Sequence, residues 1–219
     1  MIKYYTFLPE GFMVINEFEL KEEPIDRLLN KIYKYIECKR IVLDIDSIKL
    51  ALEFIIKHHA NQKRHSGDPY YHHPVEVAYI IMDYYCDTDS IIAALLHDIV
   101  EDTNISLNQL GFLFGDSILY LVDKLTKLDG SLLKFKLSNM ESSYKLLQIN
   151  KSEDNKKALT IKLIDRLHNM RTIKYISNIT KQKETAKETL LTFVPIARHV
   201  GIKEIELELT SIALRILNT

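Results

Sequence analysis

The sequence predicts an all-α body of about nine or ten helices, with a small β-hairpin or extended arm at its N-terminus. The helices are predicted by two observations. Six glycines and five prolines in 219 residues are too few for a fold of many short strands joined by turns. Apolar residues also recur every three or four positions in several segments, which is the spacing of one helix face. The arm is predicted by an aromatic and β-branched stretch at residues 3–19.

The elements follow in order along the chain. The stretch 3–19 is interrupted by Pro9-Glu10-Gly11, which favours a turn between two strands. We expect it to be a structural flap, with a regulatory or oligomerisation arm as the alternative. Three apolar stripes then predict helices: Leu28, Leu29, Ile32, Tyr33 and Ile36; Ile118, Leu121, Val122 and Leu125; and Ile202, Ile205, Leu209, Ile212 and Ile216. Polar stretches around 129–131 and 150–155 are expected to be loops.

Composition and charge exclude several classes of protein. Lys plus Arg number 29 and Asp plus Glu number 30, so the chain lacks the basic excess typical of proteins that bind nucleic acid through its phosphates. No stretch approaches the roughly 20 apolar residues of a membrane span, and the N-terminus does not resemble a signal peptide. We therefore expect a cytoplasmic protein in which Cys38 and Cys86 are reduced thiols.

Histidines cluster in one part of the chain. Of the eight histidines, five lie between positions 58 and 73: His58, His59, His65, His72 and His73. His73 directly precedes Pro74, and proline is favoured at the first position of a helix. His73 is therefore predicted at a helix entrance, where its side chain can point into a cleft, although a lone histidine there is more often a cap or packing residue.

The stretch Ala93–Thr103 places charge after an apolar run. The run predicts a mostly buried helix, yet the stretch carries His97, Asp98, Glu101 and Asp102. On a single helix these four side chains crowd one side and one end. Three carboxylates at a helix C-terminus are unfavourable for the helix dipole, and buried carboxylates need a compensating charge such as a metal ion. An exposed acidic helix end is the weaker alternative.

A third stretch, Ile161–Thr172, predicts a helix packed on one face. Asp165 and Asn169 are four residues apart and share a face of that helix. Between Thr160 and Lys174 there are four cations and one anion. One carboxylate amid cations suits a metal beside a phosphate-rich ligand, while the alternative is that Asp165 pairs with a neighbouring arginine.

Together these stretches offer four metal ligands, which are His73, His97, Asp98 and Asp165. Two imidazoles and two carboxylates suit one divalent ion such as Mn²⁺, and the ligand types leave Zn²⁺ and Fe²⁺ open.

The motifs resemble those of a known family. A histidine before a helix, a His-Asp doublet and a distant aspartate form the pattern of the HD superfamily of metal-dependent phosphohydrolases. Residues 64–78 (RHSGDPYYHHPVEVA), 93–103 (AALLHDIVEDT), 161–172 (IKLIDRLHNMRT) and 194–201 (VPIARHVG) resemble successive motifs of its RelA/SpoT-type hydrolase domain, which degrades the alarmone (p)ppGpp. The resemblance covers roughly residues 45 to 217. It implies an HD-domain multi-helix bundle at 45–219, preceded by an extension at 1–44 that comprises the arm and a helix.

The resemblance also implies a reaction. The 3′-pyrophosphate of ppGpp or pppGpp would be removed, giving GDP or GTP plus pyrophosphate, with the metal polarising a phosphate oxygen and activating a water. Glu101 and Asp102 are the candidates to orient or deprotonate that water or to protonate the leaving oxygen. Arg64, His65, Ser66, Asn169 and Thr172 match positions that contact the nucleotide. The alternative for Arg64 and Ser66 is a role in turn structure, and for Thr172 helix packing.

Two departures and two further alternatives accompany this interpretation. The family's usual lysine after the arginine is His65 here, and the chain resembles a single-domain small alarmone hydrolase or one part of a longer bifunctional enzyme. His65 leaves open another phosphorylated nucleotide, such as the 2′-phosphate of NADPH or a 3′-phosphorylated adenine nucleotide. A non-catalytic nucleotide-sensing module is the other alternative. The expected partner is a small nucleotide, with neither nucleic acid nor membrane as a partner, and the oligomeric state is left open.

Overall fold

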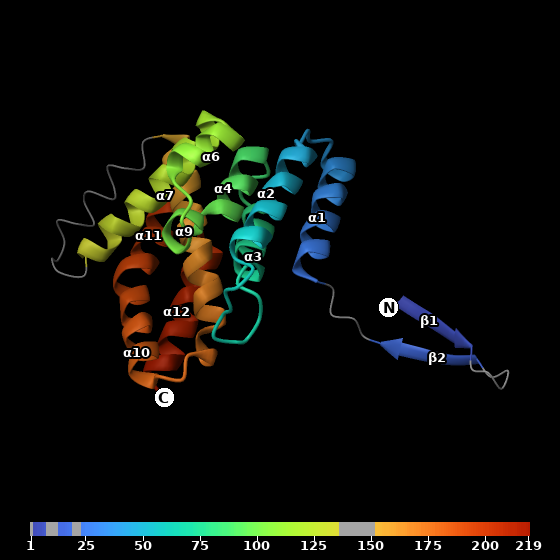
Figure 1. Ribbon diagram of the computed structural model, residues 1–219. Coiled ribbons are helices and arrows are strands. Elements are labelled where there is room, and N and C mark those ends of the chain that lie inside the picture. Colours follow the sequence, from blue (N-terminus) through green and yellow to red (C-terminus); the bar gives the residue numbers. More distant parts are fainter. Residues whose placement is uncertain (1, 8–12, 19–22, 136–151) are drawn as a thin grey trace.

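The computed structural model describes residues 2–7, 13–18, 23–135 and 152–219 (Figure 1). Its body is all-α, as the sequence predicts. The helices are α1 (Pro24–Lys39), α2 (Ile45–His58), α3 (His72–Ile81), α4 (Thr88–Leu96), α5 (Ile99–Asp102), α6 (Leu107–Phe114), α7 (Asp116–Phe135), α9 (Glu153–Arg171), α10 (Ile179–Glu188), α11 (Val194–Val200) and α12 (Lys203–Leu217). A 3-10 turn, η1 (Ile173–Tyr175), follows α9, and a π-helical turn, η2 (Thr189–Phe193), joins α10 to α11.

The N-terminal stretch forms two strands, β1 (Ile2–Phe7) and β2 (Met13–Phe18). They pair antiparallel, with Ile2 opposite Phe18 and Phe7 opposite Met13. The residues between them, where the sequence predicts a turn at Pro9-Glu10-Gly11, lie outside the described residues.

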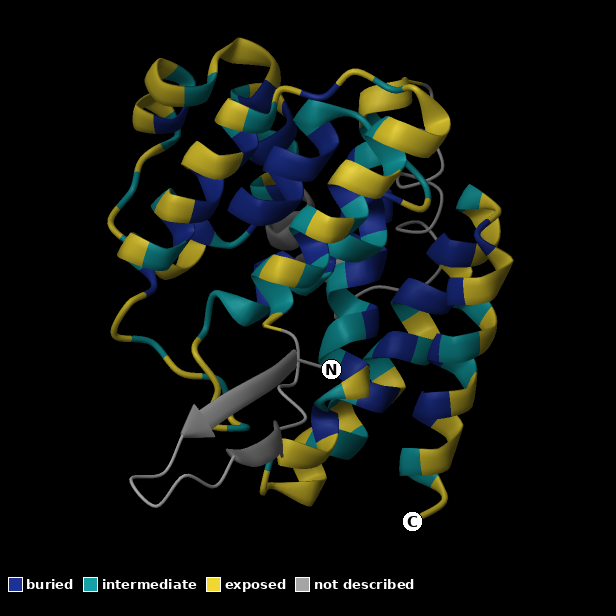
Figure 2. Cartoon of the chain, turned by 90° about the vertical axis from the view of Figure 1, so that its right-hand side faces the viewer, coloured by how far each residue is buried: buried dark blue, intermediate teal, exposed yellow. Residues whose placement is uncertain are grey.

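Three helices form the centre of the body. Helix α3 packs against both α4 and α9, and α4 also packs against α2 and α7. All residues of α4 from Ser90 to Leu96 are buried, as are those of α9 from Ala158 to Ile164. Figure 2 shows the buried residues on the inward faces of the helices. A side chain that points from α3, α4 or α9 toward the others is therefore surrounded by buried residues.

The apolar stripes lie where the sequence predicts them. Leu28 and Ile32 of α1 are fully buried, although Tyr33 of the same stripe is 48% exposed. Helix α1 packs on α3, and its contacts there include an ion pair between Arg27 and Glu76 at 2.8 Å. The stripes of α7 and α12 are buried at all positions except the last of α12, Ile216, which is partly buried.

Helix starts near the centre are capped by side chains. Asp87 accepts a hydrogen bond from the backbone nitrogen of Ser90 at 2.9 Å and begins α4. Ser152 does the same for α9 through the backbone nitrogen of Asn155, at 3.3 Å. These caps satisfy backbone N–H groups that have no partner within the helix.

Three expectations from the sequence are wrong. In the stretch 150–155, expected to be a loop, residues 153–155 already belong to α9, while residues 150 and 151 lie outside the described residues. Residues 93–103 do not form one helix, because α4 ends at Leu96, residues 97 and 98 form a turn, and α5 begins at Ile99. The residues around 129–131 are not a loop, because they are helical and belong to α7. A glycine inside a helix costs only about 1 kcal/mol relative to alanine, so one glycine between helical stretches does not end the helix.

No helix in the described part of the chain has both the length and the apolar character that crossing a membrane requires.

Candidate functional site

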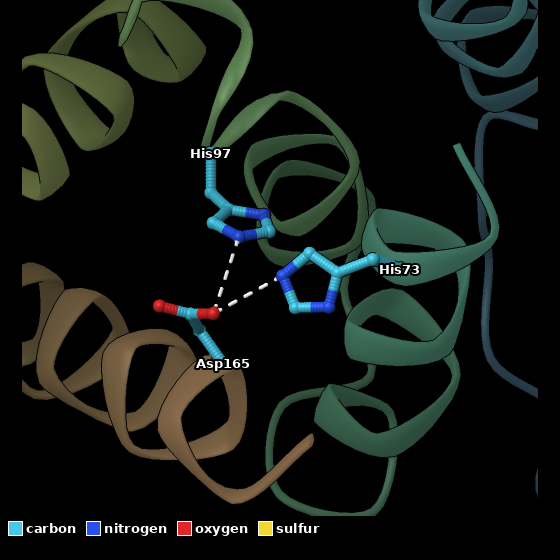
Figure 3. A group of neighbouring side chains, drawn as sticks. All are labelled: His73, His97 and Asp165. Carbon is cyan, nitrogen blue, oxygen red and sulfur yellow. Dashed lines mark ion pairs between the residues drawn. The ribbon is translucent and has the colours of Figure 1, made fainter. Parts of the chain in front are cut away.

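Three of the predicted ligands meet at the centre of the body (Figure 3). His73, His97 and Asp165 each contribute a ligand atom, and these atoms all lie within 4.8 Å of one another. The Oδ1 atom of Asp165 is 3.1 Å from Nε2 of His73 and 3.8 Å from Nε2 of His97. Both histidines are buried. We call these three residues, together with Asp98, the metal-ligand group.

The helices dictate these positions. His73 is the second residue of α3, and His97 lies in the turn that ends α4. Asp165 lies within α9, next to Ile164, which is fully buried. Because α3 packs against both α4 and α9, the three side chains reach the same point from three directions.

Asp98 lies beside the other three. Its Oδ1 is 3.1 Å from Nε2 of His97, and its Oδ2 is 3.6 Å from Nε2 of His73. The turn that breaks the expected helix places two adjacent residues, His97 and Asp98, against the same partners. The structure therefore brings all four predicted ligands together.

The two histidines direct nitrogens without hydrogen-bond partners at the carboxylates. Nε2 of His73 and Nε2 of His97 are buried and have no hydrogen-bond partner among the described residues. Nδ1 of His97 lies 2.8 Å from the carbonyl oxygen of Ala94, so it donates its proton there and leaves Nε2 to face the carboxylates. A buried imidazole nitrogen faces a carboxylate oxygen favourably only when a proton or a metal ion lies between them, and a bound metal ion takes the place of the proton. These residues therefore fit a divalent ion.

The pKa shifts show how strongly the charges interact. Burial by itself raises the pKa values of Asp98 and Asp165, but the neighbouring imidazoles outweigh it and hold both below the usual range. Burial lowers the pKa of His73, and its contact with Asp165 offsets this only in part. For His97, burial is outweighed by Asp98 and Asp165, which raise its pKa to about 10. Both carboxylates are therefore anionic at neutral pH, as metal ligands must be.

The predicted catalytic pair lies on α5, just beyond the metal-ligand group. Glu101 and Asp102 are both exposed. The phenol of Tyr70 contacts Oδ2 of Asp102 in a short hydrogen bond and lies 3.0 Å from Oδ2 of Asp98. The side chain of Gln62 also holds this end of α5, because its Nε2 donates to the carbonyl oxygen of Asp102 at 2.7 Å. Asp102 is therefore tied to the metal-ligand group through Tyr70.

The five predicted substrate contacts line one cleft. Its volume is about 400 Å³, within the range of small-molecule sites. The lining residues are Lys63, Arg64, His65, Ser66, Tyr70, Arg166, Asn169, Thr172, Ile173, Tyr175, Ile176 and Thr185. Three of these are cations and none is a carboxylate, so the cleft favours an anionic ligand.

A chain of hydrogen bonds joins this cleft to the metal-ligand group. Arg64 donates from a guanidinium nitrogen to Oδ1 of Asn169 at 2.6 Å. Asn169 in turn donates from Nδ2 to Oδ1 of Asp165, also at 2.6 Å. Arg64 also lies over the ring of Tyr70, 5.5 Å from its centroid. The cleft and the metal-ligand group therefore form one continuous site.

Two residues of the site were not predicted from the sequence. Tyr70 is half-buried, and burial together with Asp98 raises its pKa well above the usual range, so it stays a neutral donor. His168 contacts His73 through nitrogens 2.8 Å apart, and burial and His73 lower its pKa to about 3. Tyr70 lies in the motif at residues 64–78, and His168 lies in the motif at residues 161–172. The sequence did not predict their roles, because the residues that they contact are distant in the sequence.

Comparisons with known proteins agree with this architecture. The family model described as HD domain matches residues 51–203. The chain is 40% identical over 170 residues to a GTP pyrophosphokinase of Streptomyces coelicolor, and the match covers 78% of this chain and 20% of that protein. It is 39% identical over 168 residues to the GTP pyrophosphokinase rsh of Brucella ovis, covering 77% of this chain and 22% of that protein. The chain thus spans about a fifth of the length of these curated relatives.

A solved structure also matches. It belongs to a metazoan ortholog of SpoT described as hydrolysing ppGpp and acting in starvation responses. The two chains are 25% identical with a TM-score of 0.57, and the match covers 77% of this chain and 94% of that one.

Proposed function

This chain belongs to the HD-domain family, and from that premise we propose that it removes the 3′-pyrophosphate from (p)ppGpp in a reaction that depends on a divalent metal. The products are GDP or GTP and pyrophosphate. One observation supports the proposal most: two regions of opposite charge lie side by side. The first is the anionic metal-ligand group, in which two buried histidine nitrogens have no hydrogen-bond partner among the described residues, and the second is a cationic cleft of about 400 Å³. A substrate with several phosphates matches this division, because cations bind its phosphates while the metal-ligand group lies beside them.

The relatives support the choice of substrate. The metazoan SpoT ortholog with a similar fold is described as hydrolysing ppGpp. The GTP pyrophosphokinases are much longer proteins, and their names refer to a transfer of pyrophosphate. We assign the hydrolase activity here to residues 45–219 and treat residues 1–44 as an extension.

In the proposed site the ion is held by the metal-ligand group, which consists of His73, His97, Asp98 and Asp165. We propose Mn²⁺ as the ion, because two imidazoles and two carboxylates suit it. When bound, a divalent ion supplies polarisation of a phosphate oxygen and a lower pKa for water. Arg64, His65, Ser66, Asn169 and Thr172 bind the nucleotide in the cleft that they line. Arg64 has a second function, because its hydrogen bond to Asn169 links the bound substrate to the carboxylate of Asp165.

The bond changes follow from this arrangement. The oxygen of a water forms a bond to the phosphorus attached to the 3′ oxygen, and the bond between that phosphorus and the 3′ oxygen breaks. The water loses a proton to a carboxylate of α5, Glu101 or Asp102, and the carboxylic acid so formed returns that proton to the leaving 3′ oxygen, which becomes the ribose hydroxyl. Tyr70 keeps the carboxylate of Asp102 in place through its hydrogen bond.

A panel of substrates tests the proposal. Protein loaded with Mn²⁺ is incubated separately with ppGpp, pppGpp, NADPH and a 3′-phosphorylated adenine nucleotide, and the products are separated by anion exchange and identified by mass. We expect GDP from ppGpp and GTP from pppGpp, each with pyrophosphate. Larger kcat/KM for NADPH or the adenine nucleotide, with release of orthophosphate, would assign the site to another nucleotide. Binding of Mn²⁺ and ppGpp without any turnover would indicate a sensing module.

One observation keeps the second nucleotide class in the panel. His65 is exposed and lines the cleft at the position where the resembled family carries a lysine. A lysine presents an ammonium group on a long flexible chain, whereas histidine presents a short planar ring, so this position offers a phosphate a different hydrogen-bond donor. The same panel with His65→Lys measures how far this position selects the substrate.

A further inference from the structure

His73 and His168 are 95 residues apart in the sequence, and their imidazoles are in contact in the fold. Their Nδ1 atoms are 2.8 Å apart, and their ring centroids are 4.8 Å apart at an interplanar angle of 42°. Two imidazole nitrogens this close form a hydrogen bond only when one of them carries a proton and the other a lone pair. The contact therefore has a direction, which depends on the tautomers of the two rings.

The other end of His73 decides the direction. Its Nε2 faces Oδ1 of Asp165 at 3.1 Å and has no hydrogen-bond partner among the described residues. A histidine that binds a metal through Nε2 must have its lone pair there, which places its proton on Nδ1. His73 therefore donates from Nδ1, and Nδ1 of His168 accepts. His168 carries its own proton on Nε2.

His97 shows the same requirement met in another way. Its Nδ1 donates to the carbonyl oxygen of Ala94 at 2.8 Å, within its own turn of the chain. His73, at the start of α3, reaches instead a side chain of α9. The tautomer of His97 is thus fixed by the backbone and that of His73 by a residue that substitution can change.

We propose that His168 is a positioning residue that fixes the metal-binding tautomer and ring orientation of His73 by accepting the hydrogen bond from its Nδ1. This rests on the proposed function, in which His73 holds a metal ion. An acceptor on the outer nitrogen of a ligating histidine orients the ring and raises its affinity for the ion, and loss of such a partner costs about 10- to 100-fold in metal affinity. A neutral imidazole supplies that acceptor without adding a third negative charge beside Asp98 and Asp165.

The test uses two substitutions of equal shape. His168→Asn keeps an acceptor near the position of Nδ1, because the amide oxygen branches from the same carbon. His168→Leu has the same branching but no acceptor. His199→Leu, on the exposed surface of α11, is the control for loss of a histidine as such. The dissociation constant for Mn²⁺ is measured for each full-length variant by titration calorimetry, and the melting temperature is measured without added metal.

We expect His168→Leu to bind Mn²⁺ about 10- to 100-fold more weakly than wild type, while His168→Asn stays close to wild type. At saturating Mn²⁺, kcat of His168→Leu should recover, because the loss lies in metal affinity. Wild-type affinity in His168→Leu, or an equal loss in both variants, would overturn the proposal. Absence of Mn²⁺ binding in the wild type would instead refute the proposed function, so the two failures are distinguishable.

A spectroscopic measurement covers the case in which His168→Leu does not fold. Nitrogen NMR of wild-type protein with ¹⁵N-labelled histidine, loaded with diamagnetic Zn²⁺, reports which ring nitrogen carries each proton. We expect the proton of His73 on Nδ1 and that of His168 on Nε2. A proton on Nδ1 of His168 would contradict the assignment.

Discussion

At the scale of single residues, burial alone does not determine the charge of the ionisable groups. His73 and His97 are equally buried, yet the pKa of His73 is lowered and that of His97 is raised to about 10. For His97 the carboxylates of Asp98 and Asp165 outweigh burial, whereas for His73 burial and the positive charge of His97 outweigh the same carboxylates. Neighbouring charges matter here because little water screens them.

Asp98→Asn tests the metal-ligand group. The substitution keeps the shape of the side chain but removes the anion beside two buried imidazoles. We expect Mn²⁺ affinity to fall by more than the roughly 10- to 100-fold that loss of an outer partner costs, because Asp98 is proposed to bind the ion directly. Titration calorimetry measures the change. Asp154→Asn, an exposed aspartate in the first turn of α9, is the matched control, and equal affinities in the two variants would exclude Asp98 as a ligand.

Glu101→Gln tests the separation between metal binding and catalysis. Glu101 is not among the four proposed ligands, so Mn²⁺ affinity should stay near wild type. If it moves the proton of the attacking water, kcat should fall by about 10²- to 10⁴-fold. Asp102→Asn, measured in parallel, shows which carboxylate of α5 has that role. Normal turnover in both variants would remove the pair from the mechanism.

Residue types predicted the four residues of the metal-ligand group but not the residues that contact them. His73, His97, Asp98 and Asp165 stood out because histidines and carboxylates are conspicuous next to apolar helices. The partners of Tyr70 are 28 and 32 residues away, and the partner of His168 is 95 residues away. Such contacts depend on how α3, α4 and α9 pack, which one sequence does not reveal.

At the scale of elements, α9 joins the metal-ligand group to the cleft. Asp165 and Asn169 are four residues apart within α9, and Thr172 follows three residues later at its C-cap, so one side of the helix serves both the metal-ligand group and the cleft. The sequence predicted the shared face of Asp165 and Asn169 by this rule. The rule failed at residues 93–103, where it assumed a continuous helix: residues 97 and 98 form a turn, in which Asp98 contacts His73 and His97 contacts Asp165.

The start of α4 offers a prediction about stability. Asp87 accepts hydrogen bonds from the backbone and hydroxyl of Ser90, and its carboxylate is 3.0 Å from Nζ of Lys157. Asp87→Ala should lower the free energy of unfolding by about 1 kcal/mol, because it leaves the helix uncapped. Urea denaturation at pH 7 measures the change, and Asp87→Asn, which keeps an acceptor, should lose less.

The effect of Asp87→Ala should depend on pH. Burial raises the pKa of Asp87, but Ser90 and Lys157 outweigh it and lower the pKa below the usual value. A carboxylate with a lowered pKa in the folded state stabilises above its unfolded pKa, about 3.9, and loses that stabilisation as the pH falls through the folded value. The difference between wild type and Asp87→Ala should therefore shrink below about pH 4. A difference that is constant down to pH 3 would contradict this.

At the scale of the whole molecule, a net charge of −1 conceals a separation of charge. Lys63, Arg64 and Arg166 line the cleft, while Asp98 and Asp165 lie in the metal-ligand group beside it. Composition alone argued against binding to a nucleic-acid backbone. The separation shows how a nearly neutral protein can still provide a site for a small polyphosphate.

Metal binding should stabilise the entire fold, because the four proposed ligands come from α3, from α9 and from the turn that ends α4, and these elements pack together. At a Mn²⁺ concentration 100 times the dissociation constant, linkage predicts about 2.7 kcal/mol of added stability, if the unfolded chain does not bind the ion. For a chain of this length that corresponds to a melting temperature roughly 5 to 10 °C higher. Differential scanning calorimetry with Mn²⁺ and after chelation measures it, and Asp98→Asn should show little shift. An equal shift in Asp98→Asn would place the ion elsewhere.

The most direct test of the central claim is the fate of the 3′-pyrophosphate. Protein loaded with Mn²⁺ is incubated with ppGpp in water enriched in ¹⁸O, and the masses of the products are measured by mass spectrometry. Asp98→Asn is the inactive control. We predict equimolar GDP and pyrophosphate, with the ¹⁸O atom in pyrophosphate and none in GDP. Protein that binds Mn²⁺ but leaves ppGpp intact, or releases orthophosphate instead, would contradict the proposed function.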